Sequence, residues 1–172
     1  KISDAFGMME SVLKNGTADK ILITGITGLV MLLASGVNVG EKTILFLKDK
    51  DLLVHVKEAK LLLKEYPDRF ELPVDMAFEQ DGRRVEIDIC EMPKEKLYMD
   101  IGMKTVIRYA SILADAGTIF ANGPAGVYEE PIFTDGTRGI WQAIAESGGY
   151  SVIGGGDTVN SAAQFIDLSS IS

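Results

Sequence analysis

The sequence predicts an α/β domain of the Rossmann-like kind: a doubly wound, mostly parallel sheet with helices on both faces and a small antiparallel hairpin at one edge. Two observations support this class. Short apolar runs alternate with segments of helical periodicity along the 172 residues, as in sheets covered by helices on both faces. An Asp-Gly pair at 81–82 separates two strand-like runs, which is typical of a hairpin. Without repeats or linkers, residues 1–172 form one domain.

The first third of the chain starts with a helix. Apolar residues at helical spacing predict it around residues 6–13. Residues 20–23 are expected to form a short buried strand, and residues 25–34 a short helix after a glycine-bounded turn. A longer helix is expected over residues 52–63, ending before Pro67.

The middle third contains the predicted hairpin. Residues 70–78 and 83–89 are expected to be its two strands. A further helix is predicted over residues 106–113, where Val, Tyr and Leu recur at helical spacing. This hairpin would be the antiparallel edge of an otherwise parallel sheet.

The last third returns to the alternating pattern. Residues 118–121 and 150–153 are expected to be short strands, with a helix over residues 140–147 between them. Three glycines then lead into a final helix over residues 159–165. The chain begins with lysine and runs at once into a helical pattern, and it ends without a finishing element, so both ends are expected to be cuts.

Composition and charge exclude several classes of function. A hydrophobic share of 47% indicates a globular domain, and the net charge of −8 argues against nucleic acid as a partner. No apolar run approaches the roughly 18 residues of a membrane span, and no signal peptide is visible. The single cysteine, Cys90, fits a reducing compartment. We therefore expect a cytoplasmic protein, most simply a monomer.

Three glycine-containing turns follow predicted strands, at residues 24–28, 122–126 and 154–157. In open parallel sheets, ligands bind outside the carboxyl ends of the strands. The three turns are therefore expected to converge on one ligand site.

The most informative turn is segment 152–158, which reads Val-Ile-Gly-Gly-Gly-Asp-Thr. Glycines allow close backbone approach to a ligand, and the following helix would offer free N–H groups to a phosphate. Asp157 could hold Mg²⁺ beside that phosphate, and Thr158 could donate its hydroxyl. The alternative is an ordinary turn in which Asp157 or Thr158 is an N-cap.

Other candidates have equally open alternatives. Glu129, at the end of segment 120–129, could bind a ribose hydroxyl or belong to a plain turn. Lys1 could bind phosphate or be a solvated lysine. Asp75 and Asp100 are expected to act as caps or in turns, and Trp141 is expected in the core.

Two common nucleotide motifs are absent from the sequence. It contains no G-x-x-x-x-G-K-[ST], so it is not a Walker-type P-loop protein. It also lacks a G-x-G-x-x-G at a helix start, so the dinucleotide fingerprint is missing. A nucleotide would have to be bound by another arrangement of glycine turns.

Taken in order, the motifs resemble those of the phosphoglycerate kinase family, and the compact loops resemble its archaeal branch. The start Lys-Ile-Ser-Asp at 1–4 is similar to the end of the family's Gly-Gly-Ala-Lys segment. The other matches are Leu-Pro-Val-Asp at 72–75, Asp-Ile-Gly at 100–102, Asn-Gly-Pro-Ala-Gly-Val-Tyr-Glu at 122–129, Gly-Thr at 136–137 and Gly-Gly-Gly-Asp-Thr at 154–158. They span essentially the whole chain.

The resemblance implies reversible phosphoryl transfer between 1,3-bisphosphoglycerate and Mg-ADP, giving 3-phosphoglycerate and Mg-ATP, in glycolysis. The chain would be the nucleotide-binding domain, without the phosphoglycerate-binding N-terminal domain and a C-terminal tail, and would be inactive alone. By match of motif, the implied roles are nucleotide or transferring phosphate for Lys1, adenine for Gly25, the phosphate path for Asn122 and Gly123, ribose for Glu129, phosphates for Gly155, Gly156 and Thr158, and Mg²⁺ for Asp157.

The sequence departs from the family pattern at three places. Thr24-Gly25-Ile26 stands where many members have three glycines, and Ala5 stands where many have a second lysine. The family's late Ser-Thr-Gly-Gly-Gly loop is absent. A ribokinase-type sugar kinase and a non-catalytic nucleotide-binding module are the competing hypotheses.

Overall fold

The computed structural model describes residues 2–172, and Lys1 lies outside the described residues. The helices are α1 (Ile2–Lys14), α2 (Gly25–Ala34), α3 (Glu41–Asp49), α4 (Val56–Glu65), α5 (Met103–Ala114), α6 (Asp135–Glu146) and α7 (Gly156–Ala163). The strands are β1 (Ile21–Leu22), β2 (Phe70–Glu71), β3 (Asp75–Gln80), β4 (Arg83–Asp88), β5 (Asp100–Ile101), β6 (Thr118–Asn122) and β7 (Tyr150–Gly154). Short 3₁₀ turns are η1 (Leu53–His55), η2 (Ile89–Glu91), η3 (Pro131–Phe133) and η4 (Leu168–Ser170).

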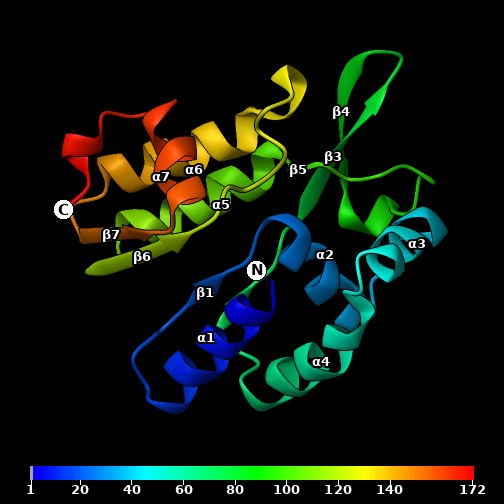
Figure 1. Cartoon of the computed structure of the whole chain (residues 1–172), viewed down its shortest axis with the longest axis horizontal. Coiled ribbons are helices and arrows are strands. Elements are labelled where there is room, and N and C mark those ends of the chain that lie inside the picture. The colour runs from blue at the N-terminus through cyan, green and yellow to red at the C-terminus, as the bar shows by residue number, and fades with distance from the viewer. Residues whose placement is uncertain (1) are drawn as a thin grey trace.

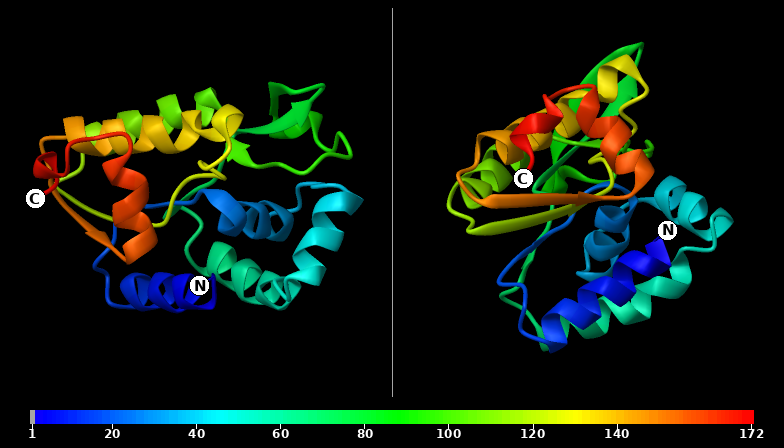
Figure 2. Two further views of the ribbon diagram at one scale, coloured as in Figure 1. Left: turned by 45° about the horizontal axis from the view of Figure 1, so that its top comes forward. Right: turned by 60° about the vertical axis from the view of Figure 1, so that its left-hand side comes forward.

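The strands form two parallel pairs and one antiparallel sheet. β1 pairs with β2 and β6 with β7, both in parallel, while β4, β3 and β5 form the antiparallel sheet in that order. Helices α5 and α6 lie on one side of the parallel strands and α1 and α4 on the other, as Figures 1 and 2 show. The α/β class with helices on both faces is confirmed. Within residues 2–172, however, the parallel strands form two separate pairs and not one continuous sheet.

The expected strand over residues 70–78 is two strands with different partners. β2 pairs with β1, and after Leu72 and Pro73 the chain enters β3 of the hairpin. Proline has no N–H to donate to a ladder, so the strand cannot continue through Pro73. The next amide, of Val74, donates instead to the hydroxyl of Thr105 (3.0 Å).

The other helix predictions need smaller changes. Helix α2 spans residues 25–34 as expected, whereas the helix expected over residues 52–63 begins with the 3₁₀ turn η1 before α4. The sequence patterns did not predict α3, whose buried residues are only Thr43 and Leu47. With so narrow a buried face, this short helix carries little apolar periodicity.

Three apolar clusters form the interior. One lies among α1, α2 and α4, one among α2, α5 and the hairpin, and one among α5, α6, α7 and β6. Trp141 belongs to the third cluster and is 2% exposed, which confirms its expected place in the core. Its indole N–H donates to the hydroxyl of Ser161 (3.1 Å). No helix within residues 2–172 has both the length and the apolar character of a membrane span.

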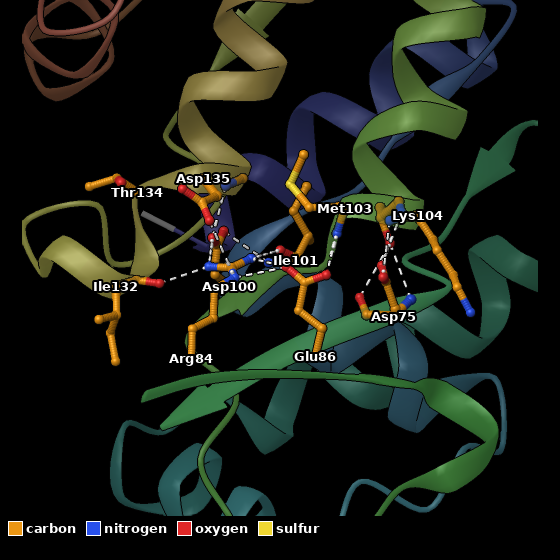
Figure 3. A network of polar contacts seen from close by, with 12 residues as sticks. Asp75, Arg84, Glu86, Asp100, Ile101, Met103, Lys104, Ile132, Thr134 and Asp135 are labelled. Atoms are coloured by element: carbon orange, nitrogen blue, oxygen red, sulfur yellow. Dashed lines mark hydrogen bonds and ion pairs between the residues drawn. The ribbon is translucent and has the colours of Figure 1, made fainter. Parts of the chain in front are cut away.

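Carboxylates from the hairpin occupy the N-terminus of α5 (Figure 3). The side chain of Asp75 accepts from the backbone N–H groups of Lys104 (3.0 Å) and Thr105 (2.9 Å). The side chain of Glu86 accepts from the N–H of Met103 (3.0 Å). The first three amides of α5, which have no acceptor within the helix, are therefore satisfied. The expected cap role of Asp75 is confirmed.

Asp100 performs the same task for α6. Its carboxylate accepts from the N–H of Gly136 (2.9 Å) and from the guanidinium of Arg84 (2.8 Å). Arg84 also donates to the carbonyls of Ile132 and Ile101, so it is held on several sides (Figure 3). The carboxylate is fully buried, and this buried pair fixes where α6 begins.

Burial changes the titration of Asp100. It raises the pKa of this carboxyl to about 6, against the lowering effect of its hydrogen bonds to Arg84 and Gly136. The folded state therefore holds a proton on Asp100 at pH values where the unfolded chain does not. The contribution of this group to the free energy of unfolding is present below pH 4 and is lost as the pH rises through about 6.

A substitution at Gly102 can test the packing around the Asp75 carboxylate. A Cβ at this position would lie 2.1 Å from the Asp75 carboxylate, although the backbone φ of −82° would accept alanine. We expect Gly102→Ala to lower the free energy of unfolding by about 3 kcal/mol, because the cap must be displaced. Gly7→Ala is the control: it lies in α1 with open space around it, and should raise stability by up to about 1 kcal/mol. Denaturant unfolding measures both, and an unchanged midpoint for Gly102→Ala would contradict the packing argument.

Arg84→Met should destabilise the protein in a pH-dependent way. Removing the guanidinium leaves the buried Asp100 carboxylate without its cation, at an expected loss of about 3 kcal/mol at pH 8. At pH 5 the loss should be smaller, because Asp100 can then be protonated, and its pKa should lie above 6 in the variant. Unfolding at both pH values and a carboxyl ¹³C titration measure these effects. The exposed neighbour gives the control Arg83→Met, which should show no such dependence; equal losses for Arg84→Met at pH 5 and 8 would refute the charge argument.

Candidate functional site

The three glycine turns come together at the carboxyl ends of the parallel strands. β6 and β7 end side by side at the pair Asn122 and Gly154. The N–H of Gly25, after β1, donates to the carbonyl of Ala125 in the second turn (3.1 Å). The N–H of Gly123 donates to the hydroxyl of Thr158 beyond the third turn (2.8 Å). The three turns therefore meet as predicted, and their role as one ligand site stays a prediction.

Glycine is required in each turn by backbone geometry. Gly25, Gly123 and Gly155 have φ values of +63°, +86° and +93°, a region that side-chain-bearing residues rarely adopt. A Cβ on Gly155 would lie at an ordinary van der Waals distance from the Asn122 Oδ1 (3.5 Å), so the backbone φ is what requires glycine there. The turns can therefore bring backbone close to a ligand as well as to each other.

The start of α7 differs from the starts of α5 and α6. Gly155 is its N-cap and no side chain caps it, so neither Asp157 nor Thr158 has the N-cap role considered from the sequence. The N–H groups of Gly156, Asp157 and Thr158 have no intrahelical acceptor. The carboxylates of the chain itself occupy the ends of α5 and α6. Of these three helices, α7 is the one that offers its positive end to an external anion.

The Thr158 hydroxyl, a candidate phosphate donor from the sequence, is buried between two glycine turns. The residue is 2% exposed, and its hydroxyl accepts from Gly123 and donates to the side-chain oxygen of Asn122 (3.2 Å). The hydroxyl is therefore engaged by groups of the protein, and its contact with a ligand stays a prediction. The backbone N–H of Thr158 has no intrahelical acceptor.

Two buried threonines hold the second turn from different helices. Thr158 of α7 accepts from Gly123, and Thr137 of α6, also buried, accepts from the N–H of Ala125 (3.2 Å). No sequence pattern predicts these roles, since a threonine near a helix start usually indicates a local cap. The position of α6, set by Asp100, thereby sets the position of the turn.

The remaining candidates lie around this arrangement. Glu129 is exposed just after the second turn and forms no hydrogen bond or ion pair with other described residues. Asp157 is likewise exposed on the first turn of α7. Lys1 lies outside the described residues, so its predicted phosphate contact has no structural counterpart.

The acidic residues near the turns suit a cation that a ligand brings with it. No three His, Cys, Asp or Glu side chains within residues 2–172 form a cage for a metal ion. Mg²⁺ commonly takes one or two carboxylates together with substrate phosphates and water. Asp157, on the same first turn of α7 as the free N–H groups, fits such a shared site.

Comparison with known proteins gives one consistent family. The family model described as phosphoglycerate kinase matches residues 1–172. Phosphoglycerate kinase from Methanothermobacter thermautotrophicus is 42% identical over 156 residues, 91% of this chain and 38% of its own length. The enzyme from Halobacterium salinarum is 39% identical over 167 residues, 96% of this chain and 42% of its own length.

Solved structures agree with the sequence comparison. The crystal structure of phosphoglycerate kinase from Pyrococcus horikoshii OT3 has a TM-score of 0.91 and 38% identity, covering 96% of this chain and 42% of its own. That of Coxiella burnetii has a TM-score of 0.84 and 29% identity, covering 99% and 44%. The chain therefore spans about two fifths of the length of the relatives it matches.

Proposed function

The chain belongs to the phosphoglycerate kinase family, and on this premise we propose that it is the part of such an enzyme that binds ADP and ATP. The observation that carries the proposal is the open N-terminus of α7 beside two further glycine turns. Anions bind at such helix ends because free N–H groups and the helix dipole act together. The proposed ligand is the phosphate chain of the nucleotide.

Each candidate residue has a place in this proposal. The backbone of Gly155, Gly156 and Thr158 would contact the phosphates, and Asp157 would hold the Mg²⁺ that the nucleotide brings. Asn122 and Gly123 would lie along the phosphate path. Three further contacts are proposed: Gly25 with adenine, Glu129 with ribose, and Lys1 with the transferring phosphate.

The proposed reaction moves a phosphoryl group from the acyl phosphate of 1,3-bisphosphoglycerate to the terminal phosphate oxygen of ADP. An acyl phosphate is a good donor and ADP needs no deprotonation, so the protein supplies position and charge compensation. Bound Mg²⁺ would neutralise part of the phosphate charge. The phosphoglycerate would be held by a part of the enzyme beyond this chain, and the whole enzyme would act in glycolysis, as a cytoplasmic monomer.

The competing hypotheses are less well supported. A ribokinase-type enzyme would use the aspartate of its glycine segment as a base toward a sugar hydroxyl, but the family match and the relatives point to phosphoglycerate kinase. A pure binding module describes only what this chain is proposed to do when isolated from the rest of the enzyme.

The isolated chain should bind Mg-ADP and transfer no phosphoryl group. Binding is expected because all three glycine turns lie within it, whereas transfer requires both substrates in line, a positioning effect of about 7–11 kcal/mol. Calorimetric titration with Mg-ADP and a coupled assay with 3-phosphoglycerate and ATP measure the two properties. Absence of nucleotide binding would contradict the proposal. Turnover by the chain alone would contradict the assignment of phosphoglycerate binding to another part of the enzyme.

Asp157→Asn should weaken the binding of Mg-ADP without weakening the binding of metal-free ADP. Metal-free ADP should bind as well as to the wild type or slightly better, because a negative charge has left the site, while Mg-ADP should bind about tenfold more weakly. Titrations with and without Mg²⁺ make the comparison. Asp19→Asn, an equal charge change at the opposite end of β1, should alter neither affinity. Equal weakening with and without Mg²⁺ would show that Asp157 is structural.

A further inference from the structure

The side-chain amide oxygen of Asn122 accepts a hydrogen bond from the hydroxyl of Thr158. Asn122 ends β6 and is exposed, whereas Thr158 is buried on α7. The N–H of Gly123 donates to the Thr158 hydroxyl oxygen (2.8 Å), and this hydroxyl donates to the Asn122 Oδ1 (3.2 Å). The three groups form a short chain of hydrogen bonds that joins the second glycine turn to the third.

The donor and the acceptor of each hydrogen bond in this chain are fixed. A backbone N–H can only donate, so the Thr158 oxygen accepts from Gly123, and its single proton needs an acceptor. Among residues 2–172, the Asn122 Oδ1 is the acceptor for that proton. If the amide were reversed, its NH₂ group would face the hydroxyl and the buried proton would be unsatisfied, at about 1–3 kcal/mol. The carbonyl end of Asn122 is therefore held inward and the Nδ2 end faces away.

We propose that Thr158 is a positioning residue that makes Asn122 face the ligand as a hydrogen-bond donor. The Nδ2 group has no hydrogen-bond partner within residues 2–172, and the Asn122 side chain lies beside Gly155, the N-cap of α7, where a Cβ would be 3.5 Å from Oδ1. A donor in this place suits a negatively charged phosphate oxygen, whereas a reversed amide would direct a carbonyl oxygen at the same anion. The inference rests on the proposed nucleotide site and specifies how that site distinguishes the two ends of an amide.

Thr137 supplies a matched control within the same turn. It is buried, comes from a neighbouring helix and accepts from Ala125 N–H (3.2 Å), as Thr158 accepts from Gly123. It has no hydrogen bond to Asn122. Loss of its hydroxyl therefore weakens the turn without releasing the amide.

The test uses the full-length enzyme that contains this chain, with Mg-ADP affinity measured by calorimetry. Thr158→Ser keeps the hydroxyl and should stay within about twofold of the wild type. Thr158→Val should weaken binding about tenfold. Asn122→Asp should weaken it more, because it loses the donor and also adds a negative charge beside the phosphates. In an Asn122→Ala background, Thr158→Val should cost no more than Thr137→Val does, because each then removes only a hydroxyl that accepts from an amide of the turn, and the larger effect of Thr158→Val passes through the Asn122 amide. Thr137→Val should weaken binding by the same factor in both backgrounds.

A second readout does not depend on affinity. Selective ¹⁵N labelling of asparagine shows the Asn122 side-chain amide signals, which ADP should shift in the wild type and in Thr158→Ser but much less in Thr158→Val. If Thr158→Val weakens binding equally with and without Asn122, Thr158 acts on the ligand directly and the positioning role is wrong. Failure of the wild type to bind ADP would instead overturn the proposed function.

Discussion

The hydrogen bond from the Gly136 amide to the buried carboxylate of Asp100 fixes the first turn of α6, and the position of the candidate site depends on it. From that turn, Thr137 holds Ala125, and Ala125 in turn accepts from Gly25. A single carboxylate in β5 thus sets the relative position of two glycine turns. The positive charge of Arg84 offsets the cost of burying the Asp100 carboxylate.

The motifs that carried the family resemblance divide into two kinds. The pairs Asp75 with Gly102 and Asp100 with Gly136 are scaffolding, because each glycine makes room for the carboxylate that caps a helix. A Cβ at either glycine would lie 2.1 Å from that carboxylate. The motifs at 122–129 and 154–158 form the candidate site itself. A sequence pattern shared across a family therefore marks the supports of a site as strongly as the site.

The sequence predicted what local patterns encode. The glycine turns and the hairpin at Asp81-Gly82 were predicted because turn residues have local signatures. Cap or turn roles were expected for Asp75 and Asp100, but the helices that they cap lie 29 to 36 positions away and could not be predicted. The break at Pro73 and the separation of the parallel pairs depend on which strands meet. The inward hydroxyl of Thr158 could not be predicted either, because its partners are 35 and 36 residues away. Contacts of this kind exist only once the helices are placed.

The distant caps also bear on how the chain folds. The carboxylates that satisfy the first amides of α5 come from residues 17, 29 and 30 positions earlier, and that of α6 from 36 positions earlier. Neither helix has a side-chain cap from its own N-cap residue, and short helices are marginal in water without tertiary contacts. Helix formation in this half of the molecule is therefore coupled to closure of loops of those lengths, which slows folding relative to a locally capped helix. The hairpin and β5 act as a folding template for the two helices as well as a support for the finished site.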